Sequence, residues 1–308
     1  MLAWLNPFRR TAAPPAAEQR VDPPSLPAVA EPVSVPPAPA SVDAPSALAW
    51  LLDCPPPDDT PLKPDEGDLV RALDAHLAAP QLPADLLPRA AGVLPQLMRL
   101  MRQEQPSRTA LAQQVLRDVV LTAEVLRLAR SPYYGGHEIP DLESALDRIG
   151  MMGLQAATAR VLLKPVFDAH GDGLAARAAA RLWQHAELKS TLCAELAPGH
   201  GAERFDALLA GLLHDMGWLA LLRLTDQLKL QVALPGSLSL DQALCKRRDR
   251  LFGRLTAEWA LAPALTALSQ AMVRTPASKI DSPLARTLRD AEQHCAESLA
   301  PREPVTLD

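Results

Sequence analysis

One short apolar segment, Gly211–Trp218, constrains the fold of this chain more than any other feature. Its sequence is Gly-Leu-Leu-His-Asp-Met-Gly-Trp, so a single adjacent pair, His214 and Asp215, interrupts an apolar helix. Burying two such polar groups costs free energy unless a metal ion, another side chain or water satisfies them. The surrounding helix is predicted to run from a cap at Asp206 to about Leu224. It is apolar nearly all round, which predicts the central, most buried element of the fold.

The composition favours a fold built from helices alone. Hydrophobic residues make up 48% of the 308 residues, but aromatic residues only 4%, and leucine and alanine supply most of the apolar positions. Leucine and alanine are strong helix formers, and no alternating strand pattern persists for more than a few residues. We therefore predict an all-α fold.

The charge, the cysteines and the hydropathy exclude several classes of protein. A net charge of −5 provides no general field that attracts nucleic-acid phosphates, so no nucleic-acid partner is expected. The four cysteines are scattered without a CxxC spacing, which indicates free thiols in a reducing compartment. No stretch of 18 or more apolar residues exists that could span a bilayer. At the N-terminus the basic residues follow the apolar ones, which is the reverse of a secretory signal. We expect a cytoplasmic protein with no transmembrane segment.

Proline usage divides the chain into parts. About half of the 31 prolines precede residue 65, among alanine and serine residues that offer little surface to bury. Such a tract is typical of a disordered, partly polyproline tether. The predicted parts are a short apolar and basic motif at 1–10, a disordered Pro/Ala-rich linker at 11–64, an accessory helix at 65–87, a helical domain at 88–298 and a flexible tail at 299–308.

A tryptophan-containing tetrapeptide occurs at both ends of this linker. Leu2–Leu5, with Trp4, and Leu48–Leu51, with Trp50, both read Leu-Ala-Trp-Leu. The repeat is interpreted as a short docking motif for a partner or, beside the basic residues of the N-terminus, for a membrane surface. Coincidence in a chain rich in leucine and alanine is the alternative.

Capping residues and turn residues define the helices of the domain. Asp118 and Asp141 are each predicted to cap a helix, and a break is expected at Gly150–Gly153. Between the first two helices, Ser131-Pro132-Tyr133-Tyr134-Gly135-Gly136 predicts a turn in which the tyrosines pack onto the core or contact a partner. Further helices are predicted at 174–196, 240–261, 264–273 and 283–298. The basic run Lys246–Arg250 is interpreted as a solvated helix face.

The ordered part of the chain resembles the HDOD domain family, helical relatives of HD-superfamily phosphohydrolases found in bacterial signalling proteins. The matching stretches occur in the family's order and spacing, and they are Asp118–Thr122, Leu126–Gly135, Ile139–Gly150, Leu182–His185 and Leu209–Gly217. The resemblance covers about residues 88 to 298. It implies a multi-helix HD-like bundle that serves as a regulatory or output module, generally without demonstrated hydrolase chemistry.

The resemblance also implies a set of candidate metal ligands. HD-superfamily enzymes hold a divalent metal with two histidines and two aspartates, which here become His185, His214, Asp215 and Asp290. Imidazole and carboxylate groups bind such metals, and a bound ion lowers the pKa of a water nucleophile. A divalent metal is therefore the one cofactor that the resemblance suggests; otherwise none is expected.

Two departures from the enzymes of that superfamily argue against catalysis. Trp218 replaces a lysine that often follows the His-Asp pair by three residues, and the histidines frequent in many relatives are absent from 248–259 and 269–272. Three alternatives follow: the four candidates form a polar network that ties helices together, hold an idle metal, or support hydrolysis.

We weigh two functions on this basis. The first is a non-catalytic HDOD-type signalling module that acts through protein–protein interaction in a bacterial signalling pathway, with Trp4, Trp50, Tyr133 and Tyr134 as candidate partner-binding residues. The second is a metal-dependent phosphohydrolase or phosphodiesterase acting on a nucleotide or cyclic dinucleotide. The identity of the partner and the oligomeric state do not follow from the sequence.

Overall fold

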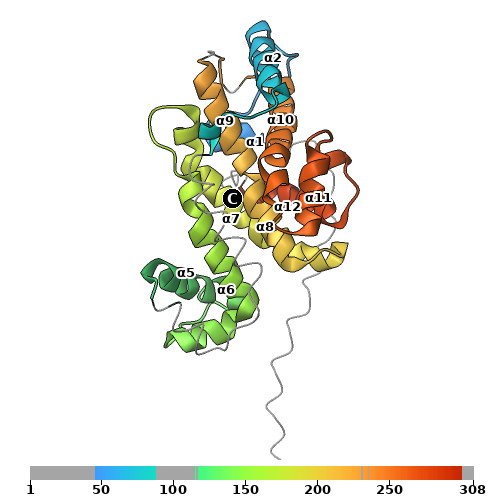
Figure 1. The fold of residues 1–308 in the computed structure, drawn as a ribbon. Helices are drawn as coiled ribbons and strands as arrows, with labels where there is room; N and C mark the ends of the chain where they lie inside the picture. Colours follow the sequence, from blue (N-terminus) through green and yellow to red (C-terminus); the bar gives the residue numbers. More distant parts are fainter. Residues whose placement is uncertain (1–45, 88–114, 116, 230–231, 235, 300–308) are drawn as a thin grey trace, which may run out of the picture. The chain divides into compact units, whose positions relative to one another are not determined.

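Helices are the regular elements throughout the part of the chain that the computed structural model describes, residues 46–87, 115, 117–229, 232–234 and 236–299, and no strand occurs there (Figure 1). The prediction of an all-α fold is confirmed. In chain order the elements are α1 (Ala47–Leu52), α2 (Pro64–Ala78), η1 (Ala84–Leu86), α5 (Val119–Ala129), η2 (Pro132–Tyr134), α6 (Leu142–Phe167), α7 (Leu174–His200), α8 (Arg204–His214), α9 (Met216–Leu228), α10 (Leu238–Thr256), η3 (Ala257–Trp259), α11 (Pro263–Met272), η4 (Ala277–Lys279) and α12 (Pro283–Leu299).

The two predicted aspartate caps lie where the sequence places them. The Asp118 carboxylate accepts hydrogen bonds from the backbone N–H groups of Val120 and Leu121, and Asp141 accepts one from Ser144. Each cap satisfies N–H groups that the first turn of a helix leaves without a partner. The expected break after the second helix is a kink at Gly150, whose φ of 62° requires glycine, and α6 continues beyond it.

The His-Asp segment forms two helices rather than one. α8 ends at His214 and α9 begins at Met216, and Asp215 lies between them with φ −73° and ψ −11°. The predicted start at Asp206 is also shifted, because α8 begins at Arg204. Together α8 and α9 are long and apolar enough to cross a membrane, but 89% of their most apolar window is buried within the protein. The expectation that this segment forms the buried centre is correct.

Two glycines allow the neighbouring helices to approach this centre closely. A Cβ atom at Gly211 would lie 2.8 Å from the Cα of Ser190 on α7, and one at Gly217 would lie 2.4 Å from the backbone oxygen of Arg248 on α10. Real Cβ atoms do not approach other atoms so closely, so any side chain at these positions would push α7 and α10 away. The glycines thus hold these two helices against α8 and α9, and α12 also packs along α7 and α8 (Figure 1).

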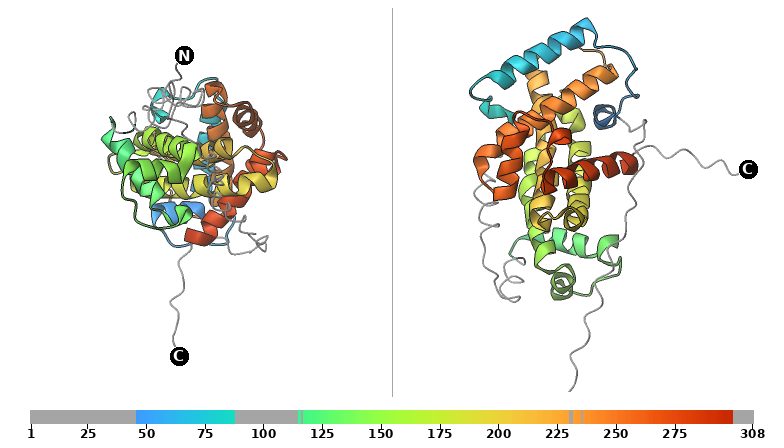
Figure 2. Two further views of the ribbon diagram at one scale, coloured as in Figure 1. Left: turned by 90° about the horizontal axis from the view of Figure 1, so that it is seen from below. Right: turned by 90° about the vertical axis from the view of Figure 1, so that its right-hand side faces the viewer.

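Part of the range 11–64, predicted as a disordered linker, is folded. Within it, α1 packs against α7, with Leu48, Leu51 and Leu52 each no more than 3% exposed. Ser46 caps α1 and donates a 2.6 Å hydrogen bond to Asp241 of α10. The high proline content of this segment led to the prediction of disorder, but the burial of these leucines stabilises the short helix. Farther along the chain, the accessory helix predicted at 65–87 is α2, which ends earlier, at Ala78, and packs on α10 (Figure 2).

Several predictions fall outside the described residues. They concern the N-terminal motif with Trp4, the linker before residue 46, the first part of the domain at 88–114, and the tail after Leu299.

Candidate functional site: a buried polar cluster

Seven polar side chains meet between α7, the α8–α9 junction, α10 and α12. They are His185, Lys189, His214, Asp215, Arg248, Asp249 and Glu292, and we refer to them as the polar cluster. All but Glu292 are less than a tenth exposed, and the Glu292 side chain is 26% exposed. Buried ionic groups are stable only when each finds partners, and the cluster meets this requirement through a continuous set of hydrogen bonds.

Lys189 occupies the centre of the cluster. Its side chain is 0% exposed, and its ammonium group donates to Asp215 Oδ1, to Glu292 Oε2 at 2.8 Å and to His214 Nδ1 at 3.1 Å. These three bonds use all the donors that an ammonium group has. Burial alone lowers the pKa of Lys189, but the charges of Asp215 and Glu292 outweigh it and hold the pKa above its usual value. Lys189 is therefore a permanent buried cation.

The bonds to His214 fix which of its ring nitrogens carries the proton. Because Lys189 donates to Nδ1, the Nε2–H group is left to donate to Asp249 Oδ1, at 3.1 Å. Burial, together with the charges of Arg248 and Lys189, lowers the pKa of His214 to about 4. His214 is thus a neutral bridge between a lysine and an aspartate at neutral pH.

The aspartate of the His-Asp pair is held by α7. Asp215 Oδ2 accepts a 2.6 Å hydrogen bond from Nδ1 of His185. Asp215 Oδ1 accepts a hydrogen bond from Lys189, which lies one helical turn after His185 on α7. Burial opposes ionisation of Asp215, yet His185 and Lys189 outweigh it and lower its pKa to about 2. The carboxylate is therefore charged and engaged at both oxygens.

A second cation, Arg248, completes the cluster from α10. Its guanidinium donates to Glu292 Oε1 at 2.6 Å and to Asp249 Oδ1 at 2.9 Å, and it lies 5.5 Å from the centre of the Trp218 ring. Asp249 also accepts from the backbone N–H of Ala277 at 2.9 Å. The interpretation of Lys246–Arg250 as a solvated face is therefore wrong for Arg248 and Asp249, which are 6% and 4% exposed.

Three of the four predicted ligands lie in the cluster, and the fourth does not. Lys189 bonds to His214 and Asp215, and Asp215 bonds to His185. Asp290, in contrast, is half-exposed and pairs with His200 of α7 at 2.8 Å. Two residues along α12 turn the helix by about 200°, so Asp290 and Glu292 point to different sides. The acidic group that α12 contributes is Glu292.

Three of these side chains are close enough to hold a metal ion. One ligand atom each from His185, Asp215 and Glu292 lies within 4.8 Å of the other two. The carboxylates of this group, however, already accept hydrogen bonds from the Lys189 ammonium. Two unit charges of like sign 4 Å apart repel by about 4 kcal/mol at an effective dielectric constant of about 20, and a divalent ion doubles this. The cluster with Lys189 in place does not fit a divalent metal.

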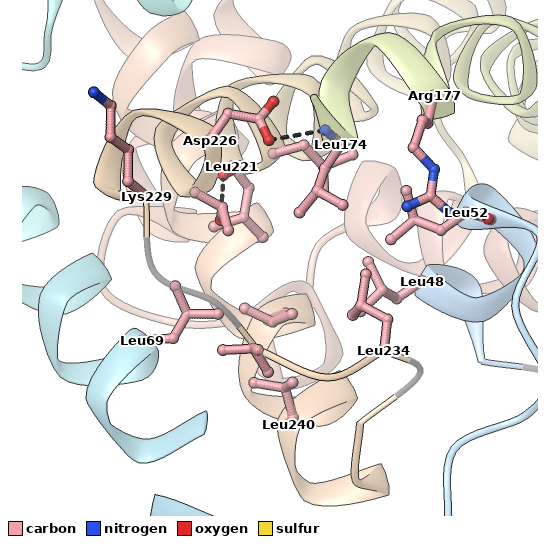
Figure 3. A pocket seen from close by; sticks show the side chains of 14 residues that line it. Leu48, Leu52, Leu69, Leu174, Arg177, Leu221, Asp226, Lys229, Leu234 and Leu240 are labelled. Atoms are coloured by element: carbon pink, nitrogen blue, oxygen red, sulfur yellow. Dashed lines mark hydrogen bonds between the residues drawn. The ribbon is translucent and has the colours of Figure 1, made fainter. Parts of the chain in front are cut away.

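A separate cavity of about 590 Å³ lies where α1, α2, α7, α9 and α10 meet. Figure 3 shows leucines from these helices converging on it, among them Leu48, Leu69 and Leu221, with Arg177 and Asp226 beside them. Asp226 caps α7 by accepting from the backbone N–H groups of Leu174 and Ala175. None of the residues of the polar cluster lines this cavity, so the chemistry of the cluster does not open into it.

The model of one family matches most of the chain. The match to the HDOD domain covers residues 87–272, and it includes the α7, α8 and α10 residues of the polar cluster. The chain belongs to the HDOD family. The HDOD resemblance stated from the sequence is therefore confirmed. The predicted domain at 88–298 extends beyond the matched range at its C-terminal end.

Two solved structures are similar to this HDOD protein. The first, from Shewanella amazonensis SB2B, is named "Putative metal-dependent phosphohydrolase"; it has a TM-score of 0.54 and 18% identity over 76% of this chain and 85% of the other. The second is an "HDOD domain protein with unknown function" from Geobacter sulfurreducens, with a TM-score of 0.49 and 18% identity over 78% and 81%. At this identity the first shows the fold alone. No curated protein matches the chain significantly.

The aromatic residues predicted to bind partners have different positions in the HDOD fold. The ring of Trp50 lies 5.9 Å from the ring of His185, centre to centre. The Arg181 guanidinium lies over the Trp50 ring and donates a 2.6 Å hydrogen bond to the backbone oxygen of Trp50. Trp50 therefore packs within the protein, beside the cluster. Tyr133 is half-exposed, and Tyr134 lies edge-on to it, 4.7 Å between ring centres.

Proposed function

We propose that this chain is a non-catalytic HDOD signalling module that acts through protein partners. The observation that carries the proposal is the Lys189 ammonium, which bonds to Asp215 and Glu292, two of the three side chains close enough together to hold an ion, and to His214. Its three bonds convert metal-binding side chains into an ionic link between α7, α8 and α12. The second cation, Arg248, engages Glu292 Oε1 from α10, and His185 engages Asp215 Oδ2, so each oxygen of these two carboxylates already bonds to a protein group.

Metal binding tests this proposal directly. Calorimetric titration of the full chain with Mn²⁺ is expected to show no saturable binding. Lys189→Ala removes the competing ammonium and leaves His185, Asp215 and Glu292 in place, so this variant is expected to bind Mn²⁺ with a rise in thermal stability. Lys164→Ala, an exposed lysine on α6, is the matched control and should behave as the unmodified chain.

Activity provides the second arm of the test. The full chain is assayed with Mn²⁺, Mg²⁺ or Fe²⁺ against common nucleotides and cyclic di-GMP, and no turnover is expected. Metal-dependent turnover that disappears in Asp215→Ala, with the fold retained, would overturn the proposal. Hydrolysis is the second candidate function because His185, Asp215 and Glu292 are close enough to hold an ion, and because a structural neighbour is named for such an activity.

The partner is sought by co-purification. The full chain and a variant lacking residues 1–45 are expressed with an affinity tag, and the captured proteins are compared. The truncation ends before Ser46 because α1 belongs to the folded domain. Loss of a specific partner on truncation assigns its binding to the N-terminal segment, whereas retention assigns it to the helical domain.

A further inference from the structure

A third buried cation, Arg160, lies at a cavity that the polar cluster does not reach. A cavity of about 240 Å³ is bounded by the end of α5, η2, α6, α7 and α8. Its charged lining is Arg160 together with Arg127 and Glu187, which pair with each other at 2.8 Å. Ser131 and Thr191 add hydroxyl groups, and the apolar lining includes Leu128 and Met152. We call it the Arg160 pocket. None of the seven cluster residues lines it, so a binding role for this pocket does not depend on whether the cluster is catalytic.

Arg160 is buried without a close carboxylate. It is 5% exposed and donates to the hydroxyl of Thr191 at 2.8 Å and, at 3.5 Å, to that of Ser190. The nearest carboxylate oxygen paired with it, on Glu124, is 3.9 Å away, and the Nε–H group has no partner. In contrast, Arg248 of the polar cluster makes two charged hydrogen bonds. Arg160 therefore lacks the oxyanion partner that a buried guanidinium normally has.

The charges around Arg160 also indicate that it lacks an anionic partner. Burial lowers the pKa of Arg160, and the more distant charges of Glu187 and Glu124 do not restore it. A positive charge thus remains undercompensated at the wall of the pocket. The Ser131 hydroxyl on the same wall is also buried without a hydrogen-bond partner, which leaves two unused polar groups at one cavity.

Aromatic side chains form the other walls. Tyr133 and Tyr134 both line the pocket, and Gly153 of α6 leaves the space that the Tyr134 hydroxyl occupies, since a Cβ there would lie 2.9 Å from it. Burial raises the pKa of Tyr134 to about 12, so its hydroxyl is neutral and a donor at physiological pH. These rings provide flat apolar surface beside the cation.

We propose that the Arg160 pocket binds a small-molecule carboxylate or phosphate carried on a planar apolar group. Arg160 would bind the oxyanion, and Tyr133 would contact the planar group. The volume admits a ligand on the order of ten heavy atoms. A cyclic dinucleotide is several times larger, which separates this site from the substrate class of the alternative hydrolase function.

Binding of small probes to the full chain tests the proposal. The probes are benzoate, phenyl phosphate and inorganic phosphate. Their binding is measured by calorimetry and by ligand-observed NMR. One of the two aromatic probes is expected to bind saturably with one site per chain. Arg160→Gln should weaken that binding at least tenfold, whereas Arg148→Gln, which removes a positive charge from the same helix outside the pocket, should leave it unchanged.

A surface variant keeps the test decisive if Arg160→Gln does not fold. Tyr133→Ala changes a half-exposed side chain and should weaken the aromatic probe without changing binding of inorganic phosphate. Absence of saturable binding of every probe at millimolar concentration would overturn the proposal. Equal affinity of the folded Arg160→Gln variant for the aromatic probe would overturn it as well.

Discussion

Two buried cations on neighbouring helices differ in how their charge is satisfied. Lys189 is 0% exposed and bonds to two carboxylates and an imidazole, and its pKa is raised. Arg160 is 5% exposed and bonds to hydroxyl groups, and its pKa is lowered. Desolvation disfavours both charges, but only that of Lys189 is compensated within the chain. The comparison indicates that the first cation stabilises the fold, and that the second provides the binding site we propose.

The largest expected effect on stability comes from removing Lys189, the cation whose charge is compensated within the chain. Lys189→Ala leaves Asp215 and Glu292 facing each other without the ammonium, and breaking such a buried pair typically costs about 3–5 kcal/mol. The free energy of unfolding, measured in urea at pH 7 without divalent metal, is expected to fall by this amount. Lys164→Ala should change it by less than about 0.5 kcal/mol. A loss below about 1 kcal/mol for Lys189→Ala would show that the cluster contributes little to stability.

A pH dependence of intermediate size is expected from His214. Its pKa is about 4 in the folded chain, against an ordinary value of 6.5, so between these values the unfolded chain binds a proton that the folded chain does not. Stability from this residue is therefore present above pH 6.5 and is lost as the pH falls toward 4, by up to about 3 kcal/mol. Urea unfolding at pH 7 and pH 5 measures the part of this loss that falls between these pH values, about 2 kcal/mol.

The control for this prediction replaces the histidine. His214→Gln should lose less stability between pH 7 and pH 5 than the unmodified chain, although its stability at pH 7 is lower. His137→Gln, in the exposed turn before α6, should retain the full pH dependence. The same slope in both variants would contradict the assignment to His214.

The smallest expected effect on stability comes from removing Arg160, the cation without a close carboxylate. Arg160→Met keeps much of the side-chain volume and removes a charge that has no close carboxylate, so the free energy of unfolding is expected to change by at most about 1 kcal/mol. The measurement is the same urea titration at pH 7. A loss as large as that of Lys189→Ala would show that the two cations are equivalent, and the comparison would no longer hold.

Much of the fold followed from local patterns in the sequence. The caps at Asp118 and Asp141 and the buried centre around His214 were predicted, because capping and apolar periodicity are local properties. The helix α1 was missed because it is only six residues long and lies among prolines. Its stability comes from contacts with α7 and α10, which are distant in sequence.

The polar cluster was predicted only in part, for a similar reason. Lys189 follows His185 by four residues, which places both on one face of α7, and this spacing was a signal available in the sequence. On α12 the buried residues Leu288, Ala291 and Cys295 mark the inner face, next to Glu292 rather than Asp290. Arg248 and Asp249 gave no such signal, since a run of charged residues on a helix is ordinarily solvated.

Lys189 has a consequence for how genomes are searched for hydrolases of this superfamily. A search that scores only the His-Asp dipeptide does not take Lys189 into account, although its ammonium group bonds to both residues of that pair and to Glu292. The residue one turn after the first histidine is therefore a useful second criterion. If the proposed function holds, we expect a basic side chain there to distinguish chains with such a buried ion pair from chains that bind a metal.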